Sequence, residues 1–218
     1  MAALFPPWTN TALPLGAAAI VAAGAVGIAA PMIYVRMPYS TEQLTPVEQP
    51  VEFDHRHHVG DAQIDCIYCH ASAEVSPSAG VPDTETCMGC HSQVWPESVL
   101  LEPVRRSYFS GKPIPWRRVH RLPEFVYFDH SVHVQYEIDC ATCHGAVEQM
   151  ARVYQVAPLT MGWCLECHRD PESYLAKRAS GPLEHDTTWS AAIANMTPEI
   201  ATRRRSVDRL TTCTACHR

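Results

Sequence analysis

The first 35 residues of the chain contain no aspartate, glutamate, lysine or arginine. Within them, 23 uncharged residues run from Leu13 to Val35, and as a helix they would extend over about 34 Å, enough to cross a bilayer. Pro14 is suited to the first turn of such a helix, and Pro31 would bend it near its end. We therefore expect residues 1–35 to form an N-terminal transmembrane anchor.

The same segment lacks the basic residues with which a cleavable signal peptide begins. A signal peptide is the alternative interpretation, because Ala23-Gly24-Ala25 resembles a cleavage site. The missing lysine and arginine favour an uncleaved, single-pass anchor. Residues 36–52, which contain three prolines, are expected to form an extended linker after it.

The chain also has no run of alternating apolar and polar residues long enough to predict a substantial β-sheet. Its 18 prolines and its aromatic content of 8% are typical of short helices joined by loops. The predicted fold is therefore mainly α, with extensive irregular loops and little or no β-sheet. Loops are expected at residues 76–82 and 112–115, and helices over 171–179 and from residue 198 to the C-terminus.

No cysteine lies outside one motif, Cys-x-x-Cys-His, which contains all ten cysteines of the chain. This confinement excludes a disulfide framework, whose cysteines would not share one spacing. A structural zinc site normally combines two Cys-x-x-Cys motifs, so five copies would leave one motif without a partner. Zinc binding also does not require the histidine that follows every copy. The copies occupy residues 66–70, 87–91, 140–144, 164–168 and 213–217.

Cys-x-x-Cys-His is the attachment motif of c-type haem. Its two thiols each add to a vinyl group of one porphyrin, and the adjacent histidine becomes the proximal ligand of the iron. Five motifs therefore predict five covalent haems c. The attachment residues would be Cys66, Cys69, Cys87, Cys90, Cys140, Cys143, Cys164, Cys167, Cys213 and Cys216, and the proximal ligands His70, His91, His144, His168 and His217.

The chain lacks a net positive charge, which argues against a nucleic-acid partner. Its formal charge is −6, and ten haem propionates would bring the loaded protein to about −16. The arginines are clustered at residues 105–106, 117–121 and 203–205. Guanidinium groups pair well with carboxylates, so these clusters are suited either to propionates or to a solvated or docking surface.

An internal repeat organises four of the five motifs. A Phe-Asp-His-x-x-His unit begins at Phe53 before the first motif and again at Phe128 before the third. Each unit is followed by two motifs, so the sequence repeats over residues 53–95 and 128–170, and the fifth motif lies outside the duplication. We expect residues 53–218 to form one pentahaem domain.

The histidines of these units are candidate distal ligands. Two histidines three residues apart project from neighbouring faces of a helix, so they could reach two different irons and hold those haems close together. His57 and His185 are expected to be surface residues. The five candidates are His55, His58, His120, His130 and His133, of which His120 completes the count.

Met161, three residues before Cys164, is an alternative distal ligand. A thioether in place of an imidazole would raise the potential of that haem. If Met161 is a ligand, one of the five histidines is not. The other interpretation of Met161 is a side chain that fills a gap beside a porphyrin.

The closely spaced haem motifs resemble those of class III and c7-type multihaem cytochromes. The uncharged N-terminal segment, the duplicated units, the five motifs and the stretches WRRVHRLPEFVYFDHSVH and LTMGWCLECH together resemble one family more closely. That family comprises the pentahaem cytochrome c subunits of alternative complex III, and the resemblance extends over residues 13–218.

This resemblance implies a subunit of a quinol-oxidising complex that also contains iron–sulfur and membrane subunits. Electrons would pass from the iron–sulfur clusters through these haems to a soluble cytochrome c, a copper protein or a terminal oxidase, in a respiratory or photosynthetic chain. Haem is attached to cytochromes c outside the cytoplasmic membrane. The resemblance therefore also implies a bacterial cytoplasmic-membrane protein with residues 36–218 on the periplasmic or exterior face.

No residue is expected to act as an acid, a base or a nucleophile, so we predict a redox subunit without catalytic residues of its own. One alternative is an autonomous, membrane-anchored multihaem quinol dehydrogenase, against which the long linker between Val35 and Cys66 weighs. The other is a multihaem reductase with an open iron. Such reductases usually replace one motif histidine by lysine, whereas all five histidines are present here.

Overall fold

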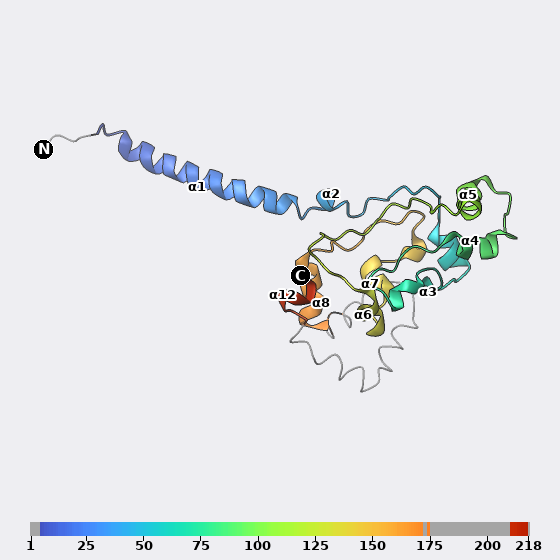
Figure 1. Cartoon of the computed structure of the whole chain (residues 1–218). Coiled ribbons are helices and arrows are strands. Elements are labelled where there is room, and N and C mark those ends of the chain that lie inside the picture. Colours follow the sequence, from blue (N-terminus) through green and yellow to red (C-terminus); the bar gives the residue numbers. More distant parts are fainter. Residues whose placement is uncertain (1–4, 172–173, 175–209, 218) are drawn as a thin grey trace. The chain divides into compact units, whose positions relative to one another are not determined.

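The computed structural model describes residues 5–171, 174 and 210–217 (Figure 1). The chain divides into two compact units, Met1–Gln43 and Leu44–Arg218. The first unit contains the uncharged N-terminal segment, and the second contains all five Cys-x-x-Cys-His motifs.

The first unit is dominated by one long apolar helix. α1 (Thr9–Tyr34) has 26 residues, none of them charged or buried, and among the described residues it is the one helix long and apolar enough to cross a membrane. The helix begins four residues before the predicted Leu13, because uncharged sequence continues back to this point. Pro14 therefore lies inside the helix and not in its first turn.

Aromatic side chains stand at both ends of α1. Trp8 precedes its first residue and Tyr34 is its last, and both side chains are more than half exposed. Tryptophan and tyrosine are enriched where transmembrane helices pass through the interface between lipid and water. A helical turn, α2 (Pro38–Thr41), follows before the unit ends.

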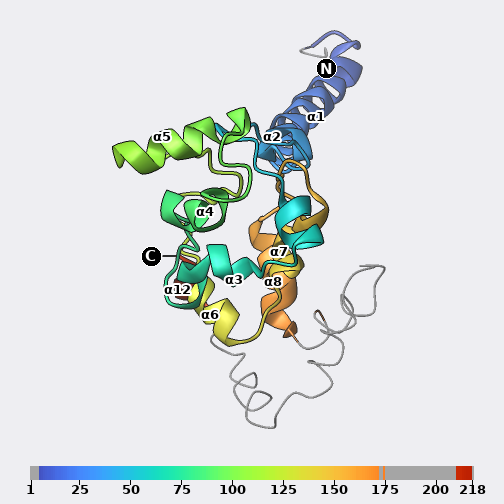
Figure 2. The ribbon, with the colours of Figure 1, turned by 90° about the vertical axis from the view of Figure 1, so that its right-hand side faces the viewer.

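The second unit consists of short helices and helical turns joined by loops (Figure 2). Its described residues form no strand, and their one isolated bridge joins Val126 to His217. The predicted mainly α fold and the two predicted loops are confirmed. In chain order the elements are η1 (Arg56–Asp61), α3 (Cys66–Cys69), η2 (Ala71–Glu74), α4 (Thr84–His91), η3 (Val99–Leu101), α5 (Glu102–Ser110), α6 (His130–Gln135), α7 (Cys140–His144), η4 (Val147–Gln149), α8 (Met161–Arg169) and α12 (Cys213–Cys216).

Every motif lies on one of these short helices. Asp65 caps α3, Asp83 caps α4 and Thr160 caps α8, each by accepting a hydrogen bond from a backbone N–H of the first turn. Such a cap satisfies a donor that has no partner within the helix. The caps therefore determine where each of these motifs becomes helical. The helix predicted over 171–179 and most of the one predicted from 198 lie outside the described residues.

The two repeats pack against each other reciprocally. η1 of the first repeat contacts η4, which follows the third motif, and α6 of the second repeat contacts η2, which follows the first motif. His130 adds a further link between the repeats just beyond η2, because its backbone N–H and its ring Nδ1 both bond to the carbonyl of Pro77. The duplicated sequence thus produces a duplicated contact.

The second half of the predicted linker belongs to the second unit. Leu44 and Val47 donate backbone hydrogen bonds of 2.8 and 3.2 Å to the carbonyls of Gln155 and Val153. Val51 is buried. The chain is therefore extended in this region but is held against the unit that carries the motifs.

The aliphatic core of the second unit is small. Its buried apolar side chains, among the described residues, are Val51, Ala73, Val104, Met150 and Ala157. A chain that wraps several large apolar cofactors needs little aliphatic core of its own, because the macrocycles supply apolar contacts.

We expect Asp83→Ala to lower the free energy of unfolding, because α4 loses its N-terminal cap. Chemical denaturation followed by circular dichroism measures this change. Asp61→Ala is the matched control, since the Asp61 carboxylate is exposed and pairs with His57 at the surface. An equal loss of stability in both variants would contradict the capping role of Asp83.

Candidate haem-ligand sites

The motif cysteines are free thiols, and those of different motifs lie close together. The thiol of Cys66 forms a hydrogen bond with that of Cys140, which lowers the pKa of Cys66 to about 7 and raises the pKa of Cys140. Burial raises the pKa of Cys164, and the nearby Cys216 adds to this shift. The first motif therefore adjoins the third, and the fourth adjoins the fifth.

Four of the five predicted proximal histidines hold ring atom Nδ1 against a backbone carbonyl. A carbonyl oxygen accepts hydrogen bonds and donates none, so Nδ1 carries the proton and Nε2 keeps a free lone pair. This tautomer binds a metal through Nε2, and the carbonyl fixes the orientation of the ring. The bonds run from His70 to Gly80 (3.0 Å), from His91 to Val94 (3.0 Å), from His168 to Leu210 (3.1 Å) and from His217 to Phe125 (3.1 Å).

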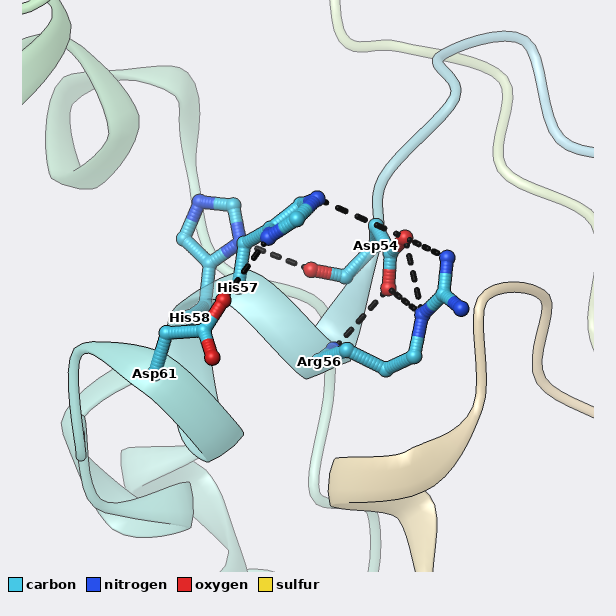
Figure 3. Close-up of polar contacts among 5 residues, drawn as sticks. All are labelled: Asp54, Arg56, His57, His58 and Asp61. Atoms are coloured by element: carbon cyan, nitrogen blue, oxygen red, sulfur yellow. Dashed lines mark hydrogen bonds and ion pairs between the residues drawn. The ribbon is translucent and has the colours of Figure 1, made fainter.

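Three predicted distal histidines have the same arrangement. His58 donates from Nδ1 to the backbone carbonyl of Asp54 at 2.9 Å (Figure 3), and His133 donates to that of Asp129 at 2.7 Å. These two bonds occupy equivalent positions in the two repeats. The third bond, 2.8 Å long, runs from His130 to Pro77 and joins the repeats.

Three pairs of rings stand as far apart as the two axial ligands of one iron. Imidazoles bound to opposite sides of a metal ion, each at about 2.0 Å, have their centroids about 6.3 Å apart. Each observed pair joins a predicted distal histidine to a predicted proximal one. The centroid distances are 6.1 Å for His58 and His91, 6.1 Å for His133 and His168, and 6.2 Å for His130 and His144.

The repeat relates His55 to His130, and His55 lies near His70. Burial is the main cause that lowers the pKa of His55 to about 4, and His70 contributes next. Burial likewise lowers the pKa of His144 to about 3 and lowers that of His133. These imidazoles are therefore neutral at neutral pH, which is the state required for binding a metal.

Two buried ring nitrogens have no hydrogen-bond partner among the described residues: Nδ1 of His55 and Nε2 of His120. An unsatisfied buried nitrogen costs about 1–3 kcal/mol, and coordination to a metal would remove that cost at Nε2. The ring of His120 lies 4.3 Å from that of His144, at an interplanar angle of 77°. That distance is shorter than the separation of two axial ligands on opposite sides of one haem iron, and no ring contact of the described residues joins His120 to His217.

The remaining candidates are less constrained. His57 is exposed and bonds through Nδ1 to Asp61 at 2.9 Å (Figure 3), in agreement with the predicted surface position. Met161 is 66% exposed and shares a face of α8 with Cys164, one turn further along. His185 lies outside the described residues.

The arginine clusters differ in their partners. Arg105 and Arg106 both bond to Glu102 at 3.2 Å, so part of their charge is satisfied within α5. The exposed arginines at positions 117, 118 and 121 take part in none of the ion pairs found among the described residues. They are therefore free to pair with propionates. The cluster at 203–205 lies outside the described residues.

These features fit haem c. Paired thiols precede each predicted proximal histidine, imidazole rings lie in pairs with centroids 6.1 Å apart, and within the described part of the chain His120 has a buried Nε2 without a hydrogen-bond partner. Iron held by two imidazoles supplies one-electron redox chemistry when haem is bound.

Comparison with known proteins finds similarity to cytochromes c. Residues 126–218 match the family described as cytochrome c7 and related cytochrome c. The chain is also 32% identical, over 128 residues, to the menaquinone reductase multihaem cytochrome c subunit of Nitratidesulfovibrio vulgaris. The comparisons support a multihaem cytochrome c. In this class haem is bound covalently. The alignment covers 57% of this chain, which spans 59% of the length of the Nitratidesulfovibrio relative.

The sequence predicted the candidate ligand histidines but not the groups that orient them. Gly80, Leu210 and Phe125 supply only backbone carbonyls, and no side-chain pattern marks such a role. Phe53 and Phe128 were visible as part of the repeat, yet their contact with the histidine rings emerges only from the structure.

We expect His133→Ala to leave one haem of the protein without its distal ligand. The reduced variant should bind carbon monoxide at one haem, and the oxidised variant should show one new high-spin iron signal in its EPR spectrum. His57→Ala is the matched control, because His57 is exposed and paired with Asp61. Carbon monoxide binding by neither variant, or by both equally, would contradict the role of His133.

Proposed function

We propose that this chain is a membrane-anchored electron-transfer subunit with five covalent haems c, one at each Cys-x-x-Cys-His motif. The observation that carries this proposal is the set of three imidazole pairs whose centroids lie 6.1–6.2 Å apart, each ending on a motif histidine. The match to cytochrome c7 over 126–218 supports it. The anchor is residues 1–35, the linker 36–52 and the pentahaem domain 53–218.

The ring pairs support a specific set of axial ligands. Within each repeat, the second histidine of the Phe-Asp-His-x-x-His unit serves the second motif and the first histidine serves the first motif. His55 with His70 completes this scheme by the symmetry of the repeat. The remaining partner, for the fifth motif, is either His120 or Met161. The proposed pairs are His55–His70, His58–His91, His130–His144 and His133–His168.

The positions of the cysteines support a relay with short steps. Cys69 lies near Cys90 of the second motif, which contributes to the raised pKa of Cys69 after burial and Cys66. Together with the neighbouring first and third motifs and the neighbouring fourth and fifth, this favours the order second, first, third, fourth, fifth. The third and fourth are linked by His130 and His133 on α6.

The protein's contribution to such a relay is positional. Backbone carbonyls hold the imidazoles of His58 and His133 in the tautomer that binds iron, and burial lowers the pKa of His133, which favours its neutral form. No side chain has to exchange a proton with a substrate, so the chain needs no catalytic acid, base or nucleophile. Covalent attachment through paired cysteines keeps successive macrocycles at fixed distances.

We further propose that the partner proteins are the iron–sulfur and membrane subunits of a quinol-oxidising complex of the alternative complex III type. The acceptor would be a soluble cytochrome c, a copper protein or a terminal oxidase, and residues 36–218 would face the periplasm or cell exterior. The name of the Nitratidesulfovibrio relative, a menaquinone reductase subunit, supports membrane quinone chemistry but gives electron flow toward the quinone. That reverse direction is the second candidate function.

Stopped-flow spectroscopy on the intact membrane complex tests the proposal and its direction. A quinol analogue should reduce the haems of the complex, whereas the purified chain alone should remain oxidised over the same time. Rapid reduction of the isolated chain would instead indicate an autonomous quinol dehydrogenase. Oxidation of pre-reduced haems by added menaquinone, without reduction by quinol, would establish the reverse direction.

A further inference from the structure

Phe53 and Phe128 each contact the two distal histidine candidates of their own repeat. The ring of Phe53 stacks on that of His58, with centroids 4.3 Å apart and planes within 24°, and it meets the ring of His55 edge-on at 4.7 Å. In the second repeat the stacked contact, with His133, is 4.5 Å and 27°, and the edge contact, with His130, is 4.7 Å. The arrangement is the same in both repeats.

The stacked histidine is not oriented by its hydrogen bond alone. The bond from Nδ1 of His133 to the carbonyl of Asp129 tolerates a range of angles at the acceptor oxygen, so it leaves the imidazole plane some freedom to tilt. A phenylalanine ring against its face restricts this tilting. Phe128 and the carbonyl of Asp129 together therefore determine the plane of the imidazole.

The edge contact carries the restraint to a second histidine. Nδ1 of His130 bonds to Pro77, whereas Nδ1 of His55 has no partner among the described residues, so the hydrogen bonding of these two histidines differs. The phenylalanine edge is common to both. The contact with phenylalanine is thus the part of the environment that the two repeats share.

We propose that Phe53 and Phe128 are positioning residues, and that each fixes the imidazole planes of distal ligands to two different haems. This inference rests on the proposed axial ligands. One phenylalanine then determines the axial geometry at two irons, and a change in it alters two haems together. Neither ring is fully buried, since Phe53 and Phe128 are both half-buried.

The test uses the full-length, haem-loaded protein. Phe128→Leu removes the aromatic face while keeping an apolar side chain of similar size, and Phe128→Tyr keeps the face. Phe109→Leu is the matched control, because Phe109 is 78% exposed on α5 and its ring contact is with Tyr108. The readouts are the low-spin EPR signals of the oxidised protein and the midpoint potentials from a spectroscopic redox titration.

Phe128→Leu should change two of the five low-spin signals and shift two midpoint potentials, and Phe128→Tyr should restore both. Phe53→Leu should change a different pair, and Phe109→Leu should change none. Changes at one haem only, at all five equally or at none would overturn the proposal, as would failure of Phe128→Tyr to restore the spectrum.

His133→Ala separates this inference from the function on which it depends. If His133→Ala creates a haem that binds carbon monoxide while Phe128→Leu leaves every signal unchanged, the axial ligands stand and the positioning role is wrong. If His133→Ala creates no such haem, the proposed axial ligand set itself is wrong.

Discussion

A histidine binds iron through a nitrogen that carries no proton, and the hydrogen bonds of the second unit meet this requirement at most of the candidate ligands. Seven described histidines place Nδ1 against a backbone carbonyl and so leave Nε2 free. Three of those carbonyls, from Pro77, Phe125 and Leu210, lie 53, 92 and 42 residues away from their histidines. The loops that bring them there therefore orient the candidate ligands.

Candidate ligands could be chosen from the sequence because the signals for them are local. The Cys-x-x-Cys-His spacing predicts five proximal ligands, and the repeated Phe-Asp-His-x-x-His unit predicts four distal ones. The uncharged N-terminal segment likewise predicted α1, since the length and composition of a membrane helix are contained in the segment itself. α1 begins four residues before the predicted start at Leu13, because no residue between Thr9 and Leu13 opposes a helix.

The packing of the second unit depends on contacts between segments that are distant in the sequence. The duplication suggests that any contact made by one repeat has an equivalent in the other. No residue pattern shows, however, that η1 packs on η4 and α6 on η2. The position of His120 beside His144 was also not predictable, because a single histidine outside the repeats carries no spacing signal. The repeat supplies no candidate for the distal ligand of the fifth motif, for which His120 and Met161 are the two candidates.

Quantitative EPR spectroscopy on the oxidised, purified protein, with haem content determined on the same sample, tests the central claim most directly. The account predicts five haems per chain, all low-spin, because every iron has two axial ligands from this chain. Four or fewer haems per chain, or a high-spin signal equivalent to one iron, would contradict it.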